Sequence, residues 1–355
     1  MTDLLSFYKG KKVLLTGHTG FKGAYLARIL QIAGAEVTGY SLMPPTDPSL
    51  FVLADVKKDM NSIEGDVRDK DHLLKVMKKA QPEIVFHLAA QPLVRLSYEE
   101  PHLTYETNVM GTVNMMEALR LTDSVRSFVN VTTDKVYYND ESQNAFKEDD
   151  PLNGYDPYSN SKSCSDIITQ SYRSSFFADR DCAISSARAG NVIGGCDFAK
   201  DRLIPDCVRA AAEGVDIIIR NPYSVRPFQH VLEPLSAYLL LAKKQYEDRS
   251  FEGAYNVGPD KSDCVNAGDM STIFCKAWEY QTDKPLKWVN LSDDGPHEAA
   301  FLMLDNQKIK DVLGWESVWN VHDAIEKTVE MEAARLEGRS VRRMLDKQIR
   351  EYFNV

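Results

Sequence analysis

Short apolar runs recur along the first half of the chain, and each ends in glycine or small polar residues. They lie at 12–17 (KVLLTG), 36–42 (EVTGYSL), 83–90 (EIVFHLAA) and 127–133 (SFVNVTT). Brief apolar runs bounded by turn residues are typical of the buried strands of a parallel sheet. We therefore expect each of these four segments to form a strand.

Helical patterns lie between these runs. In residues 21–35 (FKGAYLARILQIAGA), apolar side chains recur at helical spacing and Gly34 fits a helix C-cap. Similar patterns cover 69–80 (DKDHLLKVMKKA) and 109–119. The alternation of strand and helix predicts an α/β fold with a Rossmann-type doubly wound parallel sheet.

The pattern loosens beyond about residue 190, where no repeat or clean linker marks a boundary. We expect residues 1–190 to form the Rossmann domain with the catalytic residues. Residues 191–355 are expected to form a smaller, interleaved C-terminal lobe that mainly binds substrate. The segments expected there are strands at 183–195, 215–220 and 253–259, helices at 201–214 and 230–244, and charged helical sequence from 305 onward.

Composition narrows the classes of protein. The 355 residues carry a formal net charge of −10, which argues against nucleic acid as the main partner. The six cysteines form no CxxC pair and no zinc-ligand spacing, so we expect reduced thiols and no metal site. Residues 1–12 hold no apolar run long enough for a signal peptide or a membrane span. We expect a soluble cytoplasmic enzyme.

The first strand runs into a glycine-rich turn. TGHTGFKG, at 16–23, places Gly17, Gly20 and Gly23 directly before a predicted helix. Glycines permit a tight turn and the close approach of a pyrophosphate, and the helix N-terminus supplies free N–H groups. In this strand-turn-helix context the motif predicts a dinucleotide cofactor.

The sequence at the end of the second strand does not indicate whether the cofactor is NAD or NADP. It ends in Tyr40, Ser41 and Leu42, without the acid that holds the ribose of NAD and without an arginine for the phosphate of NADP. Asp66 follows in GDVRD. Two roles remain open for Asp66, a contact with the adenine of the cofactor or the N-cap of the next helix.

Tyr158 and Lys162, in YDPYSNSKS, stand four residues apart and share a face if the segment is helical. A lysine beside a phenol, with both near a positively charged nicotinamide, lowers the pKa of the phenol. Tyr158 is then suited to general acid–base catalysis at a sugar hydroxyl or carbonyl.

These features together resemble the extended short-chain dehydrogenase/reductase family, which acts mainly on nucleotide sugars. The resemblance rests on the glycine turn, HLAAQ at 87–91, Thr107-Asn108 followed by Gly111-Thr112, Thr133 and the Tyr158/Lys162 pair. Within that family, GHTGFKG, PPTDPSLF, TTDKVYYN, GYDPYSNSK, DRLIPD, RNPYSVRPFQHVLEPL and the HEA at His297 resemble the CDP-glucose 4,6-dehydratases. The chain departs from that branch at Cys196 and Phe198, where Gly and Trp are expected, which leaves the identity of the hexose less secure than the reaction.

The resemblance implies a reaction in three steps. The cofactor oxidises carbon 4 of the hexose, water leaves across carbons 5 and 6, and hydride returns to carbon 6. Tyr158, tuned by Lys162 and aided by Thr133, would act on the carbon 4 hydroxyl. Asp134 and Lys135 would supply the acid and the base for elimination, where related dTDP-glucose enzymes use Asp-Glu. Lysine can serve as that base only if its pKa is lowered.

A plainer interpretation of Asp134 and Lys135 is a solvated turn with a weak ion pair. The neighbouring Tyr158/Lys162 pair favours the catalytic interpretation. His87, at a strand end, is expected to be a satisfied, partly buried histidine rather than a catalytic one, with the backbone of HLAAQ lining the cofactor.

The diphosphate of a nucleotide sugar needs cations, and guanidinium matches phosphate geometry. Arg202 and Arg226 are the main candidates, while Arg188 and Arg220 are weaker ones. The residues expected to bind substrate are Gln91, Asn108, Asn191, Arg202, Arg226 and His297.

Within the phosphate turn, His18 and Lys22 would either contact the cofactor phosphates or remain solvated. The residues expected to bind NAD, held tightly and recycled, are Gly17, Gly20, Phe21, Lys22, Gly23, Asp66, Val67, Leu88, Ala89, Ala90, Thr107, Tyr158 and Lys162.

Three alternatives remain open. A nucleotide-sugar 4-epimerase shares Thr133, Tyr158 and Lys162 but needs no acid–base pair after the threonine. A dehydratase of another nucleotide-linked hexose or heptose shares the whole site. A non-catalytic NAD-binding protein on the same fold is the third, and the intact Thr133, Tyr158 and Lys162 speak against it.

The resemblance further implies a homodimer or homotetramer in a deoxysugar or lipopolysaccharide pathway, with no nucleic-acid or membrane partner. Residues 104–121 and the helix carrying Lys162 are the expected dimer helices. A Met-rich face of Met110, Met115 and Met116 would suit such an interface or an ordinary core equally well.

Overall fold

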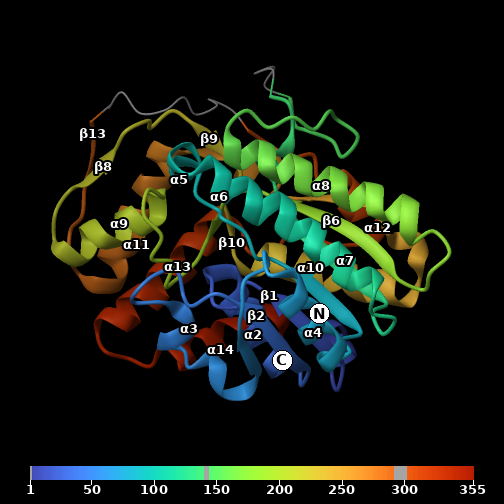
Figure 1. Ribbon diagram of the computed structural model, residues 1–355. Helices are drawn as coiled ribbons and strands as arrows, with labels where there is room; N and C mark the ends of the chain where they lie inside the picture. Colours follow the sequence, from blue (N-terminus) through green and yellow to red (C-terminus); the bar gives the residue numbers. More distant parts are fainter. Residues whose placement is uncertain (1, 140–143, 292–301) are drawn as a thin grey trace.

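Seven parallel strands form the central sheet of the computed structural model, which describes residues 2–139, 144–291 and 302–355 (Figure 1). Their order across the sheet is β11-β6-β5-β4-β1-β2-β3. The predicted doubly wound Rossmann-type sheet is confirmed. The strands are β1 (Lys12–Thr16), β2 (Glu36–Ser41), β3 (Asn61–Glu64), β4 (Ile84–His87), β5 (Ser127–Thr133), β6 (Ala183–Ala189) and β11 (Ala254–Val257).

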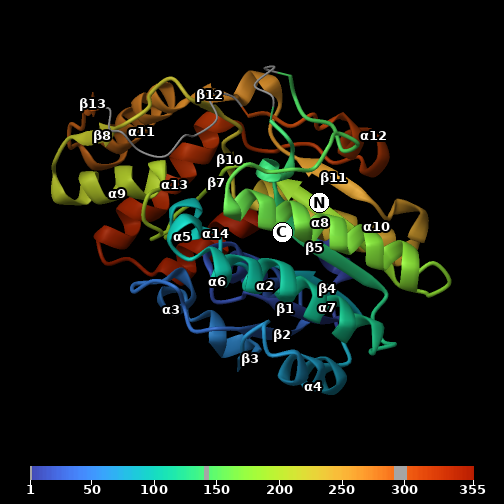
Figure 2. The same ribbon diagram turned by 45° about the horizontal axis from the view of Figure 1, so that its top comes forward.

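Alternate side chains of each strand enter two different cores, because successive residues of a strand point to opposite faces of the sheet. Val13 and Leu15 pack in one core with the helices α2 (Phe21–Ile32), α10 (Leu232–Glu247) and α14 (Val341–Phe353). On the other face, Leu14, Val85, Phe128 and Ile184 pack with α4 (Lys70–Ala80) and α7 (Gly111–Arg120), and α8 (Pro157–Phe176) runs alongside (Figure 2). This double burial explains why the strands read as continuous apolar runs.

A second, smaller core lies beyond the carboxyl end of the sheet. It is built from α9 (Leu203–Glu213), α11 (Ala267–Thr282) and the start of α13 (Val321–Leu336). Short strand pairs frame it: β7 (Val192–Ile193) with β10 (Gln229–His230), β8 (Ile217–Ile219) with β13 (Trp288–Asn290), and β9 (Val225–Arg226) with β12 (Val265–Asn266).

The remaining helices connect these layers. They are α1 (Thr2–Phe7), α3 (Leu50–Leu53), α5 (Val94–Glu99), α6 (Pro101–Tyr105) and α12 (Gln307–Leu313). The chain beyond residue 190 returns to the main sheet as α10 and β11, so the exact boundary at 190 stays a prediction. Within the three described ranges, no helix is both long enough and apolar enough to cross a membrane.

Strand β3 and helix α11 are among the elements that were not recognised from the sequence. Strand β3 reads NSIE and lies at the sheet edge, where fewer apolar side chains are needed. Helix α11 buries Met270, Phe274 and Trp278, four residues apart, so its helical signal was present in the sequence.

The helix expected at 109–119 begins at Gly111, after a π-helical turn at Glu106–Met110. The Met-rich face is not a surface: Met115 and Met116 are fully buried in the core, and Met110 alone of the three is exposed.

Candidate active site

The carboxyl ends of β1, β4, β5 and β6 meet at one edge of the sheet, the usual place for a ligand in an open α/β fold. Thr133 is the last residue of β5, and Asp134–Val136 forms a single 3₁₀ turn after it. The Thr133 hydroxyl donates to Asp134 Oδ1 at 2.9 Å and accepts from the Lys135 N–H at 3.4 Å. The sheet therefore ends at Thr133, and the residues of the 3₁₀ turn lie at its carboxyl edge.

Asp134 is buried, with 1 % of its surface exposed, so the solvated-turn interpretation is wrong for this residue. Burial raises the pKa of its carboxyl, and the positive charge of Lys135 and the Thr133 hydrogen bond oppose that rise. Its Oδ2 atom accepts no hydrogen bond from any described residue. A buried carboxyl with a raised pKa and an oxygen that no described group hydrogen-bonds is suited to donate a proton to a ligand.

Tyr158 and Lys162 lie in the first turns of α8, which begins at Pro157 and is capped by the Asp156 side chain. The Tyr158 side chain lies near enough to the Thr133 side chain for Thr133 to lower the pKa of the phenol. The ammonium of Lys162 is buried and donates to the Val131 carbonyl of β5 at 2.9 Å. Helix α8 thus brings both side chains against the end of β5, as the four-residue spacing predicts.

In the protein alone, burial raises the pKa of Tyr158 to about 12, while the Thr133 side chain and Arg202 lower it. Burial lowers the pKa of Lys162 to about 8, and Asp166 opposes that shift. The expected lowering of the Tyr158 pKa includes the charge of a bound nicotinamide as well as that of Lys162, so it stays a prediction.

Lys22 joins this group from the phosphate turn. Its ammonium lies 3.5 Å from the hydroxyl of Tyr238, a fully buried residue of α10. The pKa of Lys22 is lowered to about 7, mainly by burial and also by the charges of Arg202 and Lys162, while the charge of Asp134 opposes the shift. Sequence reasoning missed Tyr238, because its position in a Leu-rich helix indicates ordinary packing.

The glycine turn fits a dinucleotide. Gly17 has a φ of +76°, and a β-carbon at Gly23 would lie 2.0 Å from the Gly17 carbonyl oxygen. No side chain caps the N-terminus of α2. The glycines therefore permit the close backbone packing that forms this turn, and the free N–H groups at the start of the helix can bind a pyrophosphate, as in other dinucleotide turns.

His18 is neither solvated nor a phosphate contact. It is fully buried beside Gly39, hydrogen-bonds Ser62 at 2.8 Å, and burial lowers its pKa to about 4. At the end of β2, Ser41 bonds the Thr19 hydroxyl at 2.9 Å. The end of β2 therefore offers hydroxyls, not a carboxylate, to a ribose.

Asp66 is not the cap of the next helix. Asp69 caps α4, since its side chain accepts from the His72 N–H. Both carboxylate oxygens of Asp66 accept from Arg68 instead. A contact between Asp66 and an adenine stays a prediction.

The HLAAQ segment is anchored by Thr16 at the end of β1. The Thr16 hydroxyl bonds His87 Nδ1 at 2.8 Å and accepts from the N–H groups of Leu88 and Ala89. His87 is 2 % exposed, and burial lowers its pKa to about 3, which confirms a satisfied core histidine. The segment thus lies beside the glycine turn, as expected for a cofactor-lining backbone.

Gln91 and Asn108 are joined by two hydrogen bonds. The Asn108 side chain accepts from the Gln91 N–H at 2.8 Å and donates to the Gln91 carbonyl and to Ser161. The Gln91 side chain bonds Leu93 and Thr104. These amides tie the π-helical turn to α8, and their contact with a substrate stays a prediction.

Of the arginines predicted to bind the substrate diphosphate, Arg202 and Arg226 lie near the proposed catalytic residues, whereas Arg188 does not face a ligand. Arg202 is at the N-cap of α9, near enough to Tyr158 and Lys22 to affect their pKa values. Arg226 is buried near Asp134. Arg188 is excluded as a phosphate ligand, because it is 1 % exposed and forms a two-bond ion pair with Asp166.

The other substrate residues remain untested. Arg220 lies 3.7 Å from Asp201. Asn191 is half-buried just before β7, and Thr107 lies in the π-helical turn. His297 lies outside the described residues. Phe21, Val67 and Ala90 are placed around the glycine turn and the ends of β3 and β4, and their cofactor contacts stay predictions.

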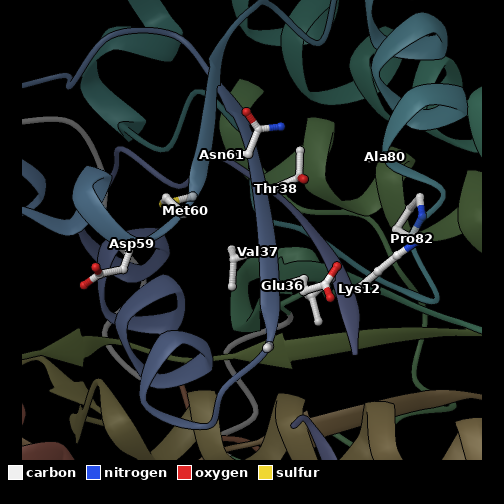
Figure 3. A pocket seen from close by; sticks show the side chains of 11 residues that line it. Lys12, Glu36, Val37, Thr38, Asp59, Met60, Asn61, Ala80 and Pro82 are labelled. Carbon is white, nitrogen blue, oxygen red and sulfur yellow. The ribbon is translucent and has the colours of Figure 1, made fainter. Parts of the chain in front are cut away.

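A separate hollow of about 320 Å³ lies at the opposite edge of the sheet (Figure 3). Lys12 and Glu36, the first residues of β1 and β2, line it together with Asp59 and Asn61. None of the predicted catalytic, cofactor-binding or substrate-binding residues lines this hollow. Within the part of the chain that the structure describes, no three His, Cys, Asp or Glu residues converge as a metal site would require.

The chain matches known proteins over nearly its whole length. Residues 14–328 match the family described as GDP-mannose 4,6 dehydratase. The chain is 42% identical to the CDP-glucose 4,6-dehydratase of Salmonella typhimurium, over 99% of this chain and 98% of that protein.

Solved structures share the fold. An epimerase of Methanothermobacter thermautotrophicus superposes with a TM-score of 0.80 at 21% identity, over 96% of this chain and 97% of that one. A dTDP-glucose 4,6-dehydratase of Bacillus anthracis, in complex with NAD, superposes with a TM-score of 0.73 at 23% identity, over 90% and 96%.

Proposed function

The chain belongs to the GDP-mannose 4,6 dehydratase family, and we propose that it is a hydro-lyase that converts CDP-D-glucose to CDP-4-keto-6-deoxy-D-glucose. The observation that carries the proposal is the buried Asp134, with its raised pKa and open Oδ2 atom, beside Thr133, Tyr158 and Lys162. The full-length 42% identity to a CDP-glucose 4,6-dehydratase supports the choice of substrate.

NAD is the proposed cofactor, bound by the glycine turn, HLAAQ, Asp66, Thr107 and the Tyr158/Lys162 pair. When bound, it accepts the hydride from carbon 4 and returns it to carbon 6. The fit rests on the uncapped N-terminus of α2 and on the tight turn that Gly17 and Gly23 permit before it. The hydroxyls of Ser41 and Thr19 replace the usual ribose-binding acid, and they do not exclude NADP.

Oxidation needs a base at the carbon 4 hydroxyl. Tyr158 takes that proton as the carbon 4 hydrogen leaves with its electron pair, and Thr133 orients the phenol. The pKa of about 12 in the protein alone means that the phenolate needs further stabilisation from neighbouring positive charge. Lys162, held against β5 by the Val131 carbonyl, is placed to stay close to the phenol.

Elimination follows because the 4-keto group acidifies the proton on carbon 5. Lys135 takes that proton, and the electrons of the C5–H bond form the C5–C6 double bond. The carbon 6 hydroxyl leaves as water with the proton of Asp134. The assignment of Asp134 is supported by its burial and geometry, and that of Lys135 by its position beside the open carboxyl.

We expect Asp134→Asn to stop the reaction after oxidation. The loss of the acid should lower the rate of dehydration by about 10²- to 10⁴-fold, while a 4-keto hexose that retains its carbon 6 hydroxyl still forms. Quenched single turnovers analysed by mass spectrometry measure both products. The exposed Asp149→Asn is the matched control. Equal losses of oxidation and dehydration would refute the separate role of Asp134.

Lys135→Ala tests the base in the same assay. It should abolish solvent exchange of the carbon 5 proton in deuterated water, whereas Lys147→Ala, at an exposed position nearby, should leave it intact. Undiminished exchange in the Lys135 variant would remove lysine from this role.

The substrate is tested by incubating the protein and NAD with CDP-glucose, UDP-glucose, dTDP-glucose and GDP-mannose, with loss of water followed by mass spectrometry. We expect dehydration of CDP-glucose. Interconversion of hexose epimers without loss of water would favour a 4-epimerase instead. Loss of water from one of the other three would keep the reaction and change the nucleotide or the sugar.

We also propose that the enzyme is a homodimer, or a homotetramer built from such dimers, joined through α7 and α8. Apolar or aromatic side chains exposed by a third or more lie at the end of α6, in the π-helical turn before α7 and on α8: Tyr105, Met110, Ile167 and Phe176. A patch of this kind suits a second copy of the chain. Ile167→Glu should then convert the dimer to a monomer in analytical ultracentrifugation, whereas Val312→Glu, at a 42 % exposed position on α12, should not.

A further inference from the structure

Tyr137 directly follows the 3₁₀ turn that carries Asp134 and Lys135, and its phenol is buried, with 2 % of its surface exposed. The phenol hydroxyl donates to Asn256 Oδ1 at 2.6 Å and accepts from Arg188 Nη1 at 2.9 Å. A buried hydroxyl that donates to one group and accepts from another has a fixed position and orientation.

Both partners of this hydroxyl belong to the central sheet. Arg188 and Asn256 are opposite each other in the parallel pairing of β6 with β11. The ring of Tyr137 also stacks on Phe146, with ring centroids 4.9 Å apart and planes 5° from parallel. The residue that ends the turn is therefore held by two strands other than β5, from which the turn emerges.

The chain before the turn is connected to the same guanidinium. Arg188 donates to both carboxylate oxygens of Asp166, and Asp166 Oδ2 accepts from the Thr132 hydroxyl at 3.1 Å. Thr132 lies two residues before Asp134, and Tyr137 lies three residues after it. The buried Arg188 therefore holds the chain on both sides of the proposed acid and base.

Elimination depends on this arrangement more than oxidation does. Thr133 is paired with Ala189 in the sheet, and Tyr158 belongs to helix α8. Asp134 and Lys135 instead lie beyond the end of β5, in a turn of three residues. A shift of the turn would therefore move the proposed acid and base while it leaves the proposed base of the oxidation step in place.

We infer that Tyr137 is a positioning residue for elimination, whose hydroxyl holds the Asp134–Val136 turn so that the proposed acid and base reach the sugar. The inference rests on the proposed function for the roles of Asp134 and Lys135. The Ser163 hydroxyl of α8 donates to the Val136 carbonyl at 2.7 Å and remains when the phenol is lost. Removal of the Tyr137 hydroxyl should therefore loosen the turn without unfolding it.

Tyr137→Phe tests the inference in quenched single turnovers with the nucleotide sugar that the unchanged protein dehydrates. Phenylalanine keeps the stacked ring and removes the hydroxyl. The rate of dehydration should fall about 10- to 100-fold, as expected for a small misplacement of reacting groups, while oxidation of carbon 4 changes less than about threefold. A 4-keto hexose that retains its carbon 6 hydroxyl should therefore accumulate.

Two further variants make the comparison specific. Asn256→Ala removes the acceptor of the phenol and should also slow dehydration; combined with Tyr137→Phe it should add little, because both changes break the same bond. Tyr8→Phe is the matched control, since Tyr8 is fully buried in another core cluster and its hydroxyl donates to the Leu239 carbonyl at 2.6 Å. It should leave the ratio of the two products unchanged.

An unchanged product ratio in Tyr137→Phe would overturn the inference. So would equal losses of oxidation and dehydration, because Tyr137 would then support the whole site, and so would a shifted ratio in Tyr8→Phe. The unchanged protein tests the proposed function separately. If it dehydrates none of the four nucleotide sugars, the proposed function fails; if it dehydrates one and the ratio stays the same in Tyr137→Phe, only the inference fails.

Discussion

Tyr158→Phe is expected to lower the turnover of CDP-glucose by about 10²- to 10⁴-fold, the usual contribution of a positioned acid–base group. Phenylalanine preserves the ring that packs at the start of α8 but removes the hydroxyl that lies beside Thr133. The first step then lacks a base, so dehydration and oxidation should fall together. This pattern separates Tyr158 from Asp134, whose loss should spare oxidation.

Tyr155→Phe provides the matched control, since Tyr155 lies three residues away and is 86% exposed. It should keep the activity of the unchanged protein. Folding of both variants is checked by circular dichroism and by the affinity for CDP. If Tyr158→Phe lost less than about tenfold, another group would have to take the carbon 4 proton.

Arg188→Ala is expected to reduce the free energy of unfolding by about 3–5 kcal/mol, because it leaves the carboxylate of Asp166 buried without its counter-ion. Arg188 donates twice to Asp166 at 2.9 Å and also bonds Tyr137 and the Glu148 carbonyl. Asp166 in turn accepts from Thr132, the residue before Thr133. The network joins β5, β6 and α8 directly behind the catalytic side chains.

Urea denaturation measures this loss. The paired change Asp166→Leu with Arg188→Met should recover most of the stability, because apolar pairs of similar volume often replace buried ion pairs without cost. Arg339→Ala should change stability by less than about 1 kcal/mol, as expected for an exposed pair. If Arg188→Ala matched that control, the buried pair would contribute nothing to the fold.

The strands and the meeting of the proposed catalytic residues were predictable from the sequence, because both follow from local patterns. β1, β4 and β5 are short apolar runs, and Thr133, Asp134 and Lys135 follow the last of them. Tyr158 and Lys162 are four residues apart in one helix. Parallel strands bring their carboxyl ends to one edge, so these residues meet there whatever the remaining packing is.

Contacts between distant segments were not predictable in this way. Lys22 meets Tyr238, Arg95 meets Asp201 and Asp166 meets Arg188 only because the sheet and the C-terminal lobe bring them together. The pKa of Tyr158 could not be read from the Tyr/Lys spacing either, because burial outweighs the neighbouring charges in the protein alone. Arg188 was a candidate for binding the diphosphate for the same reason. The sequence does not show that Asp166 is its buried ion-pair partner.

In the proposed mechanism, one active site oxidises carbon 4, eliminates water and returns the same hydride to carbon 6. This is tested by turnover of CDP-glucose labelled with deuterium at carbon 4, in unlabelled water, followed by mass spectrometry and NMR of the product. We expect a 4-keto-6-deoxy product that has lost one water and carries the deuterium at carbon 6. A product that retains its carbon 6 hydroxyl, or one that has lost the deuterium to solvent, would rule this mechanism out.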